Sequence, residues 1–498
     1  MKNYLQLEHE IEQISHLNNA ISILHWDIST NMPSGSAESR TNEITTLTSI
    51  VHSVLRSNKI AELIMKTSEE IQELDEWQLG NFREIKRKVF EASCIEDELQ
   101  KRFVSSATAC ELVWREAKRS NDYNKLKPYF REVLICIQAV SKAKGEKLNC
   151  SKYDALLDKF DPERRTTEIR SVYSILKSTI PTLIREIMEK QNSEKMLPIQ
   201  ERISIEKQKL IGKSIMEVMG FDFTRGRLDE SVHPFCGGTP YDVRLTTRYK
   251  EDNFISGLMG IIHETGHGLY EQNLPSKYKN QPVGKAKGMA VHESQSLFME
   301  MQIGRSREFT EFLSKFLRDK FEFKGLEYSS DNIYKLITRV KPDLIRVDAD
   351  EVTYPMHVIL RFELEEALIN GDVTLDELPV YWNNKMQEYL GITPKTDSDG
   401  CMQDIHWPSG AFGYFPAYTN GSIMASMLME NFKKINGNIH QEIIKGEFDG
   451  INGFLSANIR SLGSLKKCTD LLKDATNEEK INPEIFLKYL EEKYLSAK

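Results

Sequence analysis

Apolar residues near the amino terminus recur three and four positions apart. This stripe consists of Leu7, Ile11, Ile14, Leu17, Ile21 and Leu24. Such spacing places the side chains on one face of a helix and predicts that the chain opens with a long amphipathic helix. Helix-spaced apolar residues among mixed charges continue to residue 230, and we expect breaks between helices at Pro33, Pro128, Pro162, Pro181 and Pro198.

Only one stretch departs clearly from the helical period. Residues 241–249 alternate and are rich in β-branched and aromatic side chains, which predicts a short hairpin or an edge strand. The Gly- and Pro-rich cluster 234–240 and the segment 394–413 are predicted to be loops. Because the chain shows no repeat, low-complexity tract or flexible linker, the pattern favours one large, mainly α-helical body with a cleft.

A second helical pattern contains the clearest chemical signal, the pentapeptide from His263 to His267. Apolar residues surround it at helical spacing, Asp252 or Asn253 can cap the start, and residues 273–275 provide a stop. Residues four apart share one face of a helix. Two imidazoles can therefore bind one metal ion while Glu264 lies beside a bound water, the layout of a zinc peptidase.

Two histidines do not complete such a site, because a catalytic zinc takes three protein ligands and leaves a fourth position open. The next helical pattern, residues 288–300, contains Glu293, which follows His267 by 26 residues. We predict Glu293 as the third ligand. His292 and Glu300 are the alternatives; otherwise the first is a packing or supporting residue and the second a supporting or solvated carboxylate.

The composition of the chain limits which partners and which cellular compartment we expect. A net charge of -8 and a pI near 5.9 argue against nucleic-acid binding. The seven cysteines form no Cys-x-x-Cys pair, which indicates free thiols in a reducing compartment. The first ten residues carry charges where a signal peptide needs an apolar run, and no stretch approaches the ~18 apolar residues of a membrane span. We therefore expect a soluble, cytoplasmic protein that binds neither membrane nor nucleic acid.

Six short motifs occur in the order and spacing of a known family. They are His233-Pro-Phe, Asp242-Val-Arg-Leu-Thr246, His263-Glu-Thr-Gly-His267, His292-Glu-Ser-Gln295, Ile345-Arg-Val-Asp-Ala-Asp350 and Gly400-Cys-Met-Gln-Asp-Ile-His-Trp407. Together they resemble the carboxypeptidase Taq family of metallocarboxypeptidases. Leu24-His-Trp-Asp27 with Met32-Pro33, and Phe412-Gly-Tyr-Phe-Pro416, extend the resemblance to roughly residues 20–430.

The resemblance implies a mainly α-helical, saddle-shaped body with a deep groove, similar to the angiotensin-converting and neurolysin-type peptidases. It implies one domain over 1–498, in which 1–230 form the groove wall and lid region, 231–430 the metal site and substrate motifs, and 431–498 the carboxy-terminal helices. It also implies a homodimer, one divalent metal per chain and stepwise removal of carboxy-terminal residues with broad specificity. Zn2+ is the expected metal, with Co2+ or Mn2+ as substitutes. By this likeness His263, His267 and Glu293 are the ligands and Glu264 the catalytic base.

Hydrolysis also requires hydrogen-bond donors for the developing oxyanion, and an exopeptidase must hold the substrate carboxylate. His406 and Tyr414 are the candidate donors, with Tyr418 and His233 as further candidates at the substrate. Arg346, or else Arg244, is the candidate for the carboxylate, since a guanidinium binds carboxylates in bidentate fashion. Core packing is the alternative for the tyrosines. Ion pairing is the alternative for the arginines, with Asp350 and Asp242 as the acids nearest in sequence.

The chain departs from the family at Leu297 and Met299, where relatives often have Arg and Trp, and at Pro355, where a non-proline residue is more usual. These changes spare the ligands, so we expect any effect to fall on specificity. A metal-dependent oligoendopeptidase of the same helical type is the closest alternative function. A helical binding protein with a vestigial metal site is less consistent with an intact set of ligands and base.

Overall fold

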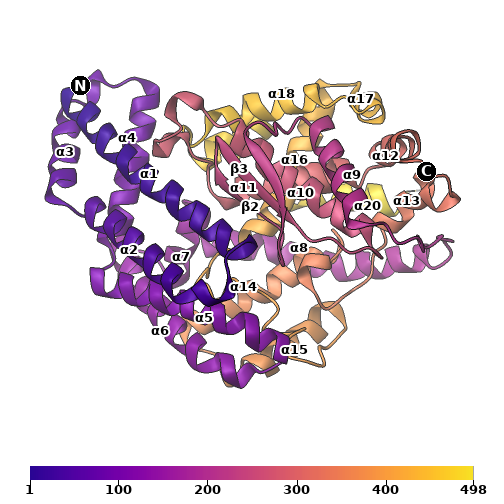
Figure 1. Cartoon of the computed structure of the whole chain (residues 1–498), viewed down its shortest axis with the longest axis horizontal. Coiled ribbons are helices and arrows are strands. Elements are labelled where there is room, and N and C mark those ends of the chain that lie inside the picture. The colour runs from indigo at the N-terminus through magenta and orange to yellow at the C-terminus, as the bar shows by residue number, and fades with distance from the viewer. Residues whose placement is uncertain (497–498) are drawn as a thin grey trace.

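The computed structural model describes residues 1–496, which form helices around one small sheet (Figure 1). The α-helices are α1 (Lys2–Thr30), α2 (Ala37–Leu55), α3 (Asn58–Glu69), α4 (Glu76–Ser93), α5 (Asp97–Ser120), α6 (Tyr123–Leu148), α7 (Lys152–Phe160), α8 (Thr166–Gln191), α9 (Ile205–Val218), α10 (Phe254–Gln272), α11 (Met289–Leu297), α12 (Arg307–Phe321), α13 (Ser330–Ile337), α14 (Tyr354–Asn370), α15 (Leu378–Leu390), α16 (Pro416–Ile435), α17 (Ile439–Lys445), α18 (Asp449–Asn458), α19 (Cys468–Thr476) and α20 (Pro483–Tyr494). The strands are β1 (Gly226–Glu230), β2 (Phe235–Thr239) and β3 (Asp242–Thr247). A mainly α-helical fold is thus confirmed.

The amino-terminal helix follows the predicted stripe. Leu7, Ile11 and Ile14 on α1 are buried, and they form a small apolar cluster with residues of α2, α3 and α4. Most other buried apolar side chains belong to one large core that contains the sheet and the central helices. In Figure 1, α1 to α4 accordingly lie together at one end of the molecule.

Two of the expected breaks between helices were wrong. Pro128 lies inside α6 and Pro181 inside α8. A proline inside a helix removes one backbone hydrogen bond and costs roughly 3 kcal/mol. Around Pro181, however, Ile180, Leu183 and Ile184 are all buried. Burial of these side chains offsets the lost hydrogen bond, and the helix continues.

The sheet is larger than the sequence predicted. Its strand order is β1-β3-β2, with β3 parallel to β1 and antiparallel to β2. The hairpin expected near residues 241–249 is therefore present, but β3 is the central strand and not an edge. The segment 234–240 was wrongly predicted to be a loop, because Phe235–Thr239 forms β2. Gly238 has a φ of 86° and its backbone lies against that of Asp242, so the glycines permit a tight hairpin.

Helices α10, α11 and α16 meet at the centre with very short separations. A Cβ at Gly266 of α10 would lie 2.5 Å from the carbonyl oxygen of Gln295. A Cβ at Gly421 of α16 would lie 2.6 Å from Cβ of Glu293. Only glycine permits this approach, so α11 is enclosed between the two neighbouring helices.

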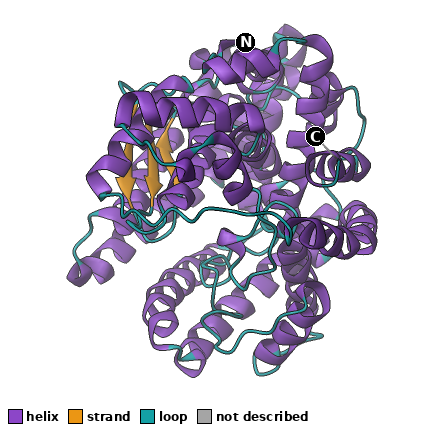
Figure 2. Ribbon diagram, turned by 90° about the vertical axis from the view of Figure 1, so that its right-hand side faces the viewer, coloured by secondary structure: helices purple, strands orange, loops and turns teal. Residues whose placement is uncertain are grey.

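The helical pattern predicted over 288–300 is α-helical only to Leu297, and the chain continues as a π-helix over Phe298–Gly304. π-Turns inside helices are rare and frequently occur at functional sites. Figure 2 shows the helices in an upper and a lower body joined by loops, with the sheet in the upper one. No helix among residues 1–496 is both long and apolar enough to cross a bilayer. The seven cysteines are free thiols, as expected.

Candidate active site

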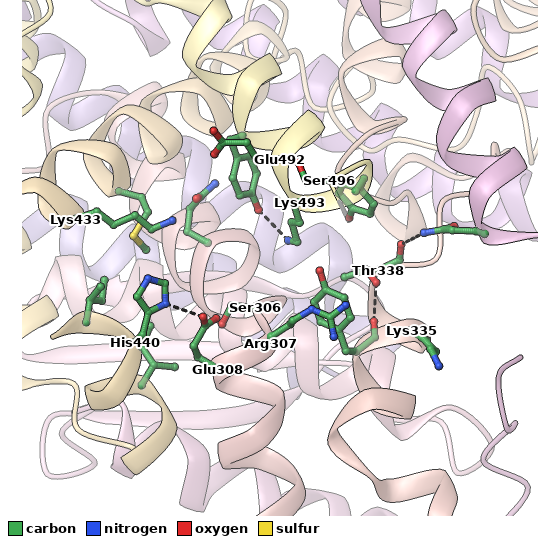
Figure 3. Close-up of a pocket in the computed structure, with 18 of the residues that line it drawn as sticks. Ser306, Arg307, Glu308, Lys335, Thr338, Lys433, His440, Glu492, Lys493 and Ser496 are labelled. Carbon is green, nitrogen blue, oxygen red and sulfur yellow. Dashed lines mark hydrogen bonds and ion pairs between the residues drawn. The ribbon is translucent and has the colours of Figure 1, made fainter. Parts of the chain in front are cut away.

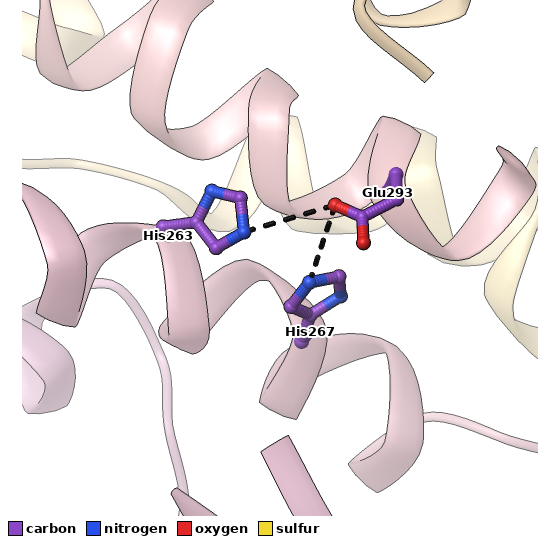
Figure 4. Close-up of side chains that lie close together, drawn as sticks. All are labelled: His263, His267 and Glu293. Carbon is purple, nitrogen blue, oxygen red and sulfur yellow. Dashed lines mark ion pairs between the residues drawn. The ribbon is translucent and has the colours of Figure 1, made fainter. Parts of the chain in front are cut away.

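The three predicted metal ligands meet at one point (Figure 4). His263 and His267 project from one face of α10, and Glu293 comes from α11. Oε2 of Glu293 lies 3.7 Å from Nε2 of His263 and 3.5 Å from Nε2 of His267. Helix α10 begins as predicted, since the Asn253 side chain accepts a hydrogen bond from the backbone of Ser256. The predicted helix therefore presents both imidazoles to one carboxylate.

The other nitrogen of each ligand imidazole has its own partner. Nδ1 of His263 lies 2.9 Å from Oε2 of Glu300, and Glu300 also pairs with Arg305 at 2.7 Å. Because a carboxylate only accepts, Nδ1 of His263 carries a proton, and the neutral ring has its lone pair on Nε2. Burial opposes protonation of His263, but Glu300 raises its pKa to about 9, so a metal would displace a proton from Nε2. His292 and Glu300 thus lie outside the ligand group among the described residues, and they contact the far sides of the two imidazoles.

The proton position on His267 follows from two successive hydrogen bonds, through His292 to Glu271. Nε2 of His292 lies 2.9 Å from Glu271, so it carries the proton, and Nδ1 of His292 is left as an acceptor. That atom lies 2.5 Å from Nδ1 of His267, which therefore donates. Both rings consequently present Nε2 to Glu293, with a lone pair on His267 and, once its Nε2 proton is lost, on His263. Such outer partners are usual for metal-binding histidines, and the donor set suits a divalent metal.

Charges in the metal-free chain favour an ionised ligand carboxylate. Burial opposes ionisation of Glu293, but His267 and His263 outweigh burial and lower its pKa to about 2. Burial lowers the pKa of His267 to about 4, which keeps that ring neutral at physiological pH. A neutral imidazole and an ionised carboxylate are the states that bind metals.

Glu264 follows the first ligand and is 5 % exposed. Its Oε2 is buried and has no hydrogen-bond partner among residues 1–496. Burial raises the pKa of Glu264 to about 8, although His263 opposes the rise. A buried carboxylate with an unpaired oxygen beside a metal-ligand group is consistent with a general base.

The carboxy-terminal loop and α16 place further candidates against the ligands. The hydroxyl of Tyr414 donates to Oε1 of Glu293 at 3.3 Å. Nε2 of His406 lies 3.1 Å from the hydroxyl of Tyr418, while Nδ1 of His406 is buried without a partner in the described chain. Burial, with the nearby Arg346, lowers the pKa of His406 to about 3. His406 is thus neutral, and its unpaired nitrogen leaves it able to accept or donate one further bond.

Arg346 continues this cluster away from the ligands. Its guanidinium lies 4.7 Å from the ring of Tyr418 and pairs with Asp404 at 3.0 Å. Its Nη1 donates to the hydroxyl of Tyr354 at 3.0 Å. The acid beside Arg346 is therefore Asp404, whereas Asp350 accepts backbone N–H groups of Val352 and Thr353.

Arg244 and His233 lie on the sheet side of the site. Arg244 binds Asp242 through Nε and Nη2, the latter at 2.7 Å, and its guanidinium stacks 4.3 Å from the Trp26 ring. The His233 ring lies 5.8 Å from that of Trp114, and burial lowers the pKa of His233 to about 4. Arg244 thus forms the ion pair with Asp242 that was the alternative to a role at the substrate carboxylate. The His233 ring is neutral at physiological pH.

The sequence analysis assigned no role to three residues of this cluster, Asp404, Arg361 and Lys118. Asp404 pairs with both Arg346 and Arg361, and Lys118 donates to the backbone carbonyl of Gln403 at 2.6 Å. Asp404 lies inside the last of the six motifs, so its position offered a signal. Lys118 lies on α5, far away in sequence, and no local pattern marks it.

A helical body with a His-Glu-x-x-His sequence on α10, and a glutamate on the next helix that could join its two histidines on one metal ion, is typical of a metallopeptidase. A family model described as carboxypeptidase Taq (M32) metallopeptidase matches residues 6–494. The chain belongs to this family, and it is therefore a metallocarboxypeptidase that uses a divalent metal.

Individual relatives match over almost the whole length. Carboxypeptidase 1 of Bacillus subtilis is 34% identical over 97% of this chain and 96% of its own. The solved structure of Trypanosoma cruzi metallocarboxypeptidase 1 has a TM-score of 0.95, 35% identity and full coverage of both chains. A Pyrococcus furiosus carboxypeptidase structure has a TM-score of 0.92, 31% identity and covers 99% of each chain. The family resemblance predicted from the six motifs is thus confirmed.

Proposed function

We propose that this protein removes carboxy-terminal residues from peptides with one divalent metal held by His263, His267 and Glu293. The single observation that carries this proposal is the convergence of the Nε2 atoms of His263 and His267 and the carboxylate of Glu293 next to Glu264. Two imidazoles and one carboxylate are typical of catalytic zinc, so Zn2+ is the proposed metal and Co2+ or Mn2+ the substitutes.

When bound, the metal polarises the scissile carbonyl and lowers the pKa of water. Glu264 takes the proton from the attacking water on Oε2 and then delivers it to the leaving amine. Its burial supports this role, because a desolvated carboxylate is a stronger base than one in water. As metal ligands His263 and His267 would be neutral, with Nδ1 of the two rings held by Glu300 and His292.

Negative charge on the former carbonyl oxygen requires donors in addition to the metal. Tyr414 supports this role, because its hydroxyl already lies 3.3 Å from a ligand oxygen and can turn from Glu293 to substrate. His406 supports it from the same loop, because its ring lies 5.1 Å from that of Tyr414 and its Nε2 is hydrogen bonded to Tyr418. His233 is proposed to line the substrate side beside Trp114 of α5.

For the free carboxylate of the substrate we propose Arg346 over Arg244. Contact through Tyr418 and Tyr414 connects Arg346 with Glu293, so the proposed carboxylate and metal positions belong to one cluster. Asp404 neutralises only part of the positive charge of Arg346, because Arg361 pairs with the same carboxylate. Arg244 has its own acid in Asp242.

Family membership further supports three proposals. The chain is proposed to form a homodimer, to act on peptides with broad specificity, and to work in the cytoplasm, where its free cysteines would stay reduced. The candidate ligands, base and substrate residues all lie within 231–430, which supports the proposed division into 1–230, 231–430 and 431–498 within one domain.

The test is mass spectrometry of two versions of one peptide, one with a free and one with an amidated carboxy terminus. We expect a ladder of single-residue losses from the free peptide, little cleavage of the amide, and no reaction after chelation until metal is restored. Internal cleavage of both versions at equal rates would instead support the oligoendopeptidase alternative. Turnover that persists after complete removal of the metal would contradict both.

A further inference from the structure

A cavity lies beside the π-helix, and none of the three candidate ligands lines it. Its volume is about 650 Å3, and α12, α13, α16, α17, α20 and the end of α8 contribute to its walls (Figure 3). Gln302 of the π-helix and Ser306 form part of its wall. A volume of this size is in the range of small-molecule sites.

Cationic side chains outnumber carboxylates in the lining. Lys190, Arg307 and Lys433 are the three whose charge is least neutralised. No carboxylate of residues 1–496 lies within 4.0 Å of the ammonium of Lys190 or Lys433, and Lys190 donates only to the carbonyl oxygens of Tyr494 and Ser496. Arg307 lies over the ring of Tyr334 at 4.1 Å and reaches Asp331 only at 4.0 Å.

The remaining charged residues of the lining are largely paired. Glu308 lies 2.6 Å from His440, Lys335 pairs with Asp331, and Lys493 pairs with the buried Glu351. Glu492 is 65 % exposed at the rim and Glu194 is half-buried. Figure 3 shows Lys433 on one side of the cavity and Arg307 between it and Lys335.

We propose that this cavity binds a small organic anion carrying a phosphate or two carboxylates. Lys433 and Arg307 supply charge-assisted hydrogen bonds, and Lys190 adds positive charge near the end of α20. Tyr334 and Tyr489 provide aromatic wall for the organic part. The site is distinct from the metal site and from the proposed substrate-carboxylate position at Arg346.

Its location also connects the cavity to a metal ligand. Ser306 and Arg307 line the cavity, while the preceding Arg305 points toward Glu300, which holds Nδ1 of His263. Arg305 also donates to the carbonyl of Ile337 at 2.7 Å, next to Thr338 of the lining. An anion that moves Arg307 or Thr338 therefore moves the support of His263, and its affinity depends on the metal.

Binding is tested with phenyl phosphate and with succinate, each titrated by calorimetry into the metal-loaded protein at constant ionic strength. We expect saturable binding of at least one probe, and the comparison tells a phosphate site from a dicarboxylate site. Lys433→Met and Arg307→Met should each weaken binding about tenfold, the effect of losing one charge-assisted bond. The matched control is Lys434→Met, since Lys434 is the next residue of α16 and lies outside the lining.

Three outcomes overturn the site: no saturable binding of either probe, equal affinity in the Lys433 and Arg307 variants, or an equal loss in the Lys434 control. Binding at the metal or at Arg346 would also be insensitive to Lys433. Because Lys433 touches neither the catalytic cluster nor the support of His263, peptidase activity of Lys433→Met without anion should be unchanged, so failure here leaves the proposed function standing. The connection to the metal requires a severalfold difference in anion affinity between metal-loaded and metal-free protein, and equal affinities overturn it.

Discussion

Glu300 accepts a hydrogen bond from Nδ1 of His263 at 2.9 Å. Glu300 belongs to a π-helix that the sequence pattern does not predict. It lies seven residues after Glu293, and both carboxylates reach His263 of α10. Arg305 holds the carboxylate from the other side at 2.7 Å. The orientation of a proposed metal ligand thus depends on a carboxylate of the π-helix.

Replacing Glu300 by Gln should weaken metal binding about 10- to 100-fold, because an outer partner fixes the tautomer and basicity of a ligand histidine. Competition with a calibrated chelator measures this affinity directly. Glu311→Gln is the control, since that glutamate is exposed on α12. Equal metal affinity in the two variants would show that Glu300 does not support His263.

Glu264→Gln should lower kcat by about 10²- to 10⁴-fold, the usual contribution of a positioned general base, while metal content stays near that of the parent protein. The amide keeps the size of the side chain but cannot take a proton from water. Single-turnover kinetics and elemental analysis of the same preparation check both statements. Full activity in this variant would remove Glu264 from the mechanism.

Tyr414→Phe should reduce kcat by about 10²-fold with little change in KM, because an oxyanion donor acts chiefly in the transition state. Tyr418→Phe is the matched comparison: its hydroxyl bonds His406 and does not reach Glu293 in the structure. A larger effect at Tyr418 than at Tyr414 would exchange their roles. Metal content measured in both variants excludes loss of the ion as the cause.

Arg346→Met should lower kcat/KM for a free-acid peptide about 10- to 100-fold more than for its amide, since one bidentate ionic contact is lost. Arg244→Met is the rival variant and should affect both peptides alike. Equal losses on the two peptides in the Arg346 variant would refute its role at the carboxylate. Selective loss in the Arg244 variant would transfer that role to the sheet.

His357 predicts a pH dependence of stability. It is 0 % exposed on α14, and burial, together with Arg361, holds its pKa well below the usual value. The unfolded chain takes up a proton there below about pH 6.5 and the folded chain does not, so the stabilising contribution present above that pH is lost as pH falls, by up to about 1.4 kcal/mol per pH unit.

His357→Met should therefore flatten the fall of unfolding free energy between pH 6.5 and 4.5. Urea titrations of metal-free protein across that range measure the slope. The same substitution at the exposed His9 serves as control and should leave the slope as it is. An unaltered slope in the His357 variant would mean that acid sensitivity comes from other groups.

Local pattern was sufficient for some features and not for others. The four-residue spacing of His263 and His267 survives in any regular helix, so their common face could be predicted. The partners of their outer nitrogens could not, because Glu300 and His292 reach them through the packing of separate helices.

Elsewhere tertiary packing outweighed local propensity. Pro181 stays within α8 because its neighbours are buried, and Phe235–Thr239 is a strand because β3 lies beside it. Arg346 was placed in a motif, but its pairing with Asp404 rather than Asp350 depends on two loops meeting. Contacts between segments distant in sequence therefore account for most of what the sequence alone did not reveal.

The glycines at 266 and 421 have a consequence for how the protein matures. Glu293 reaches its position only once the backbones of α10 and α16 have closed on both sides of α11, and these helices come from segments more than a hundred residues apart. Competence to take up the ion should then arise late in refolding, after much of the secondary structure has returned. A chain cut short before α16 would carry all three donor side chains and still fail to gather them.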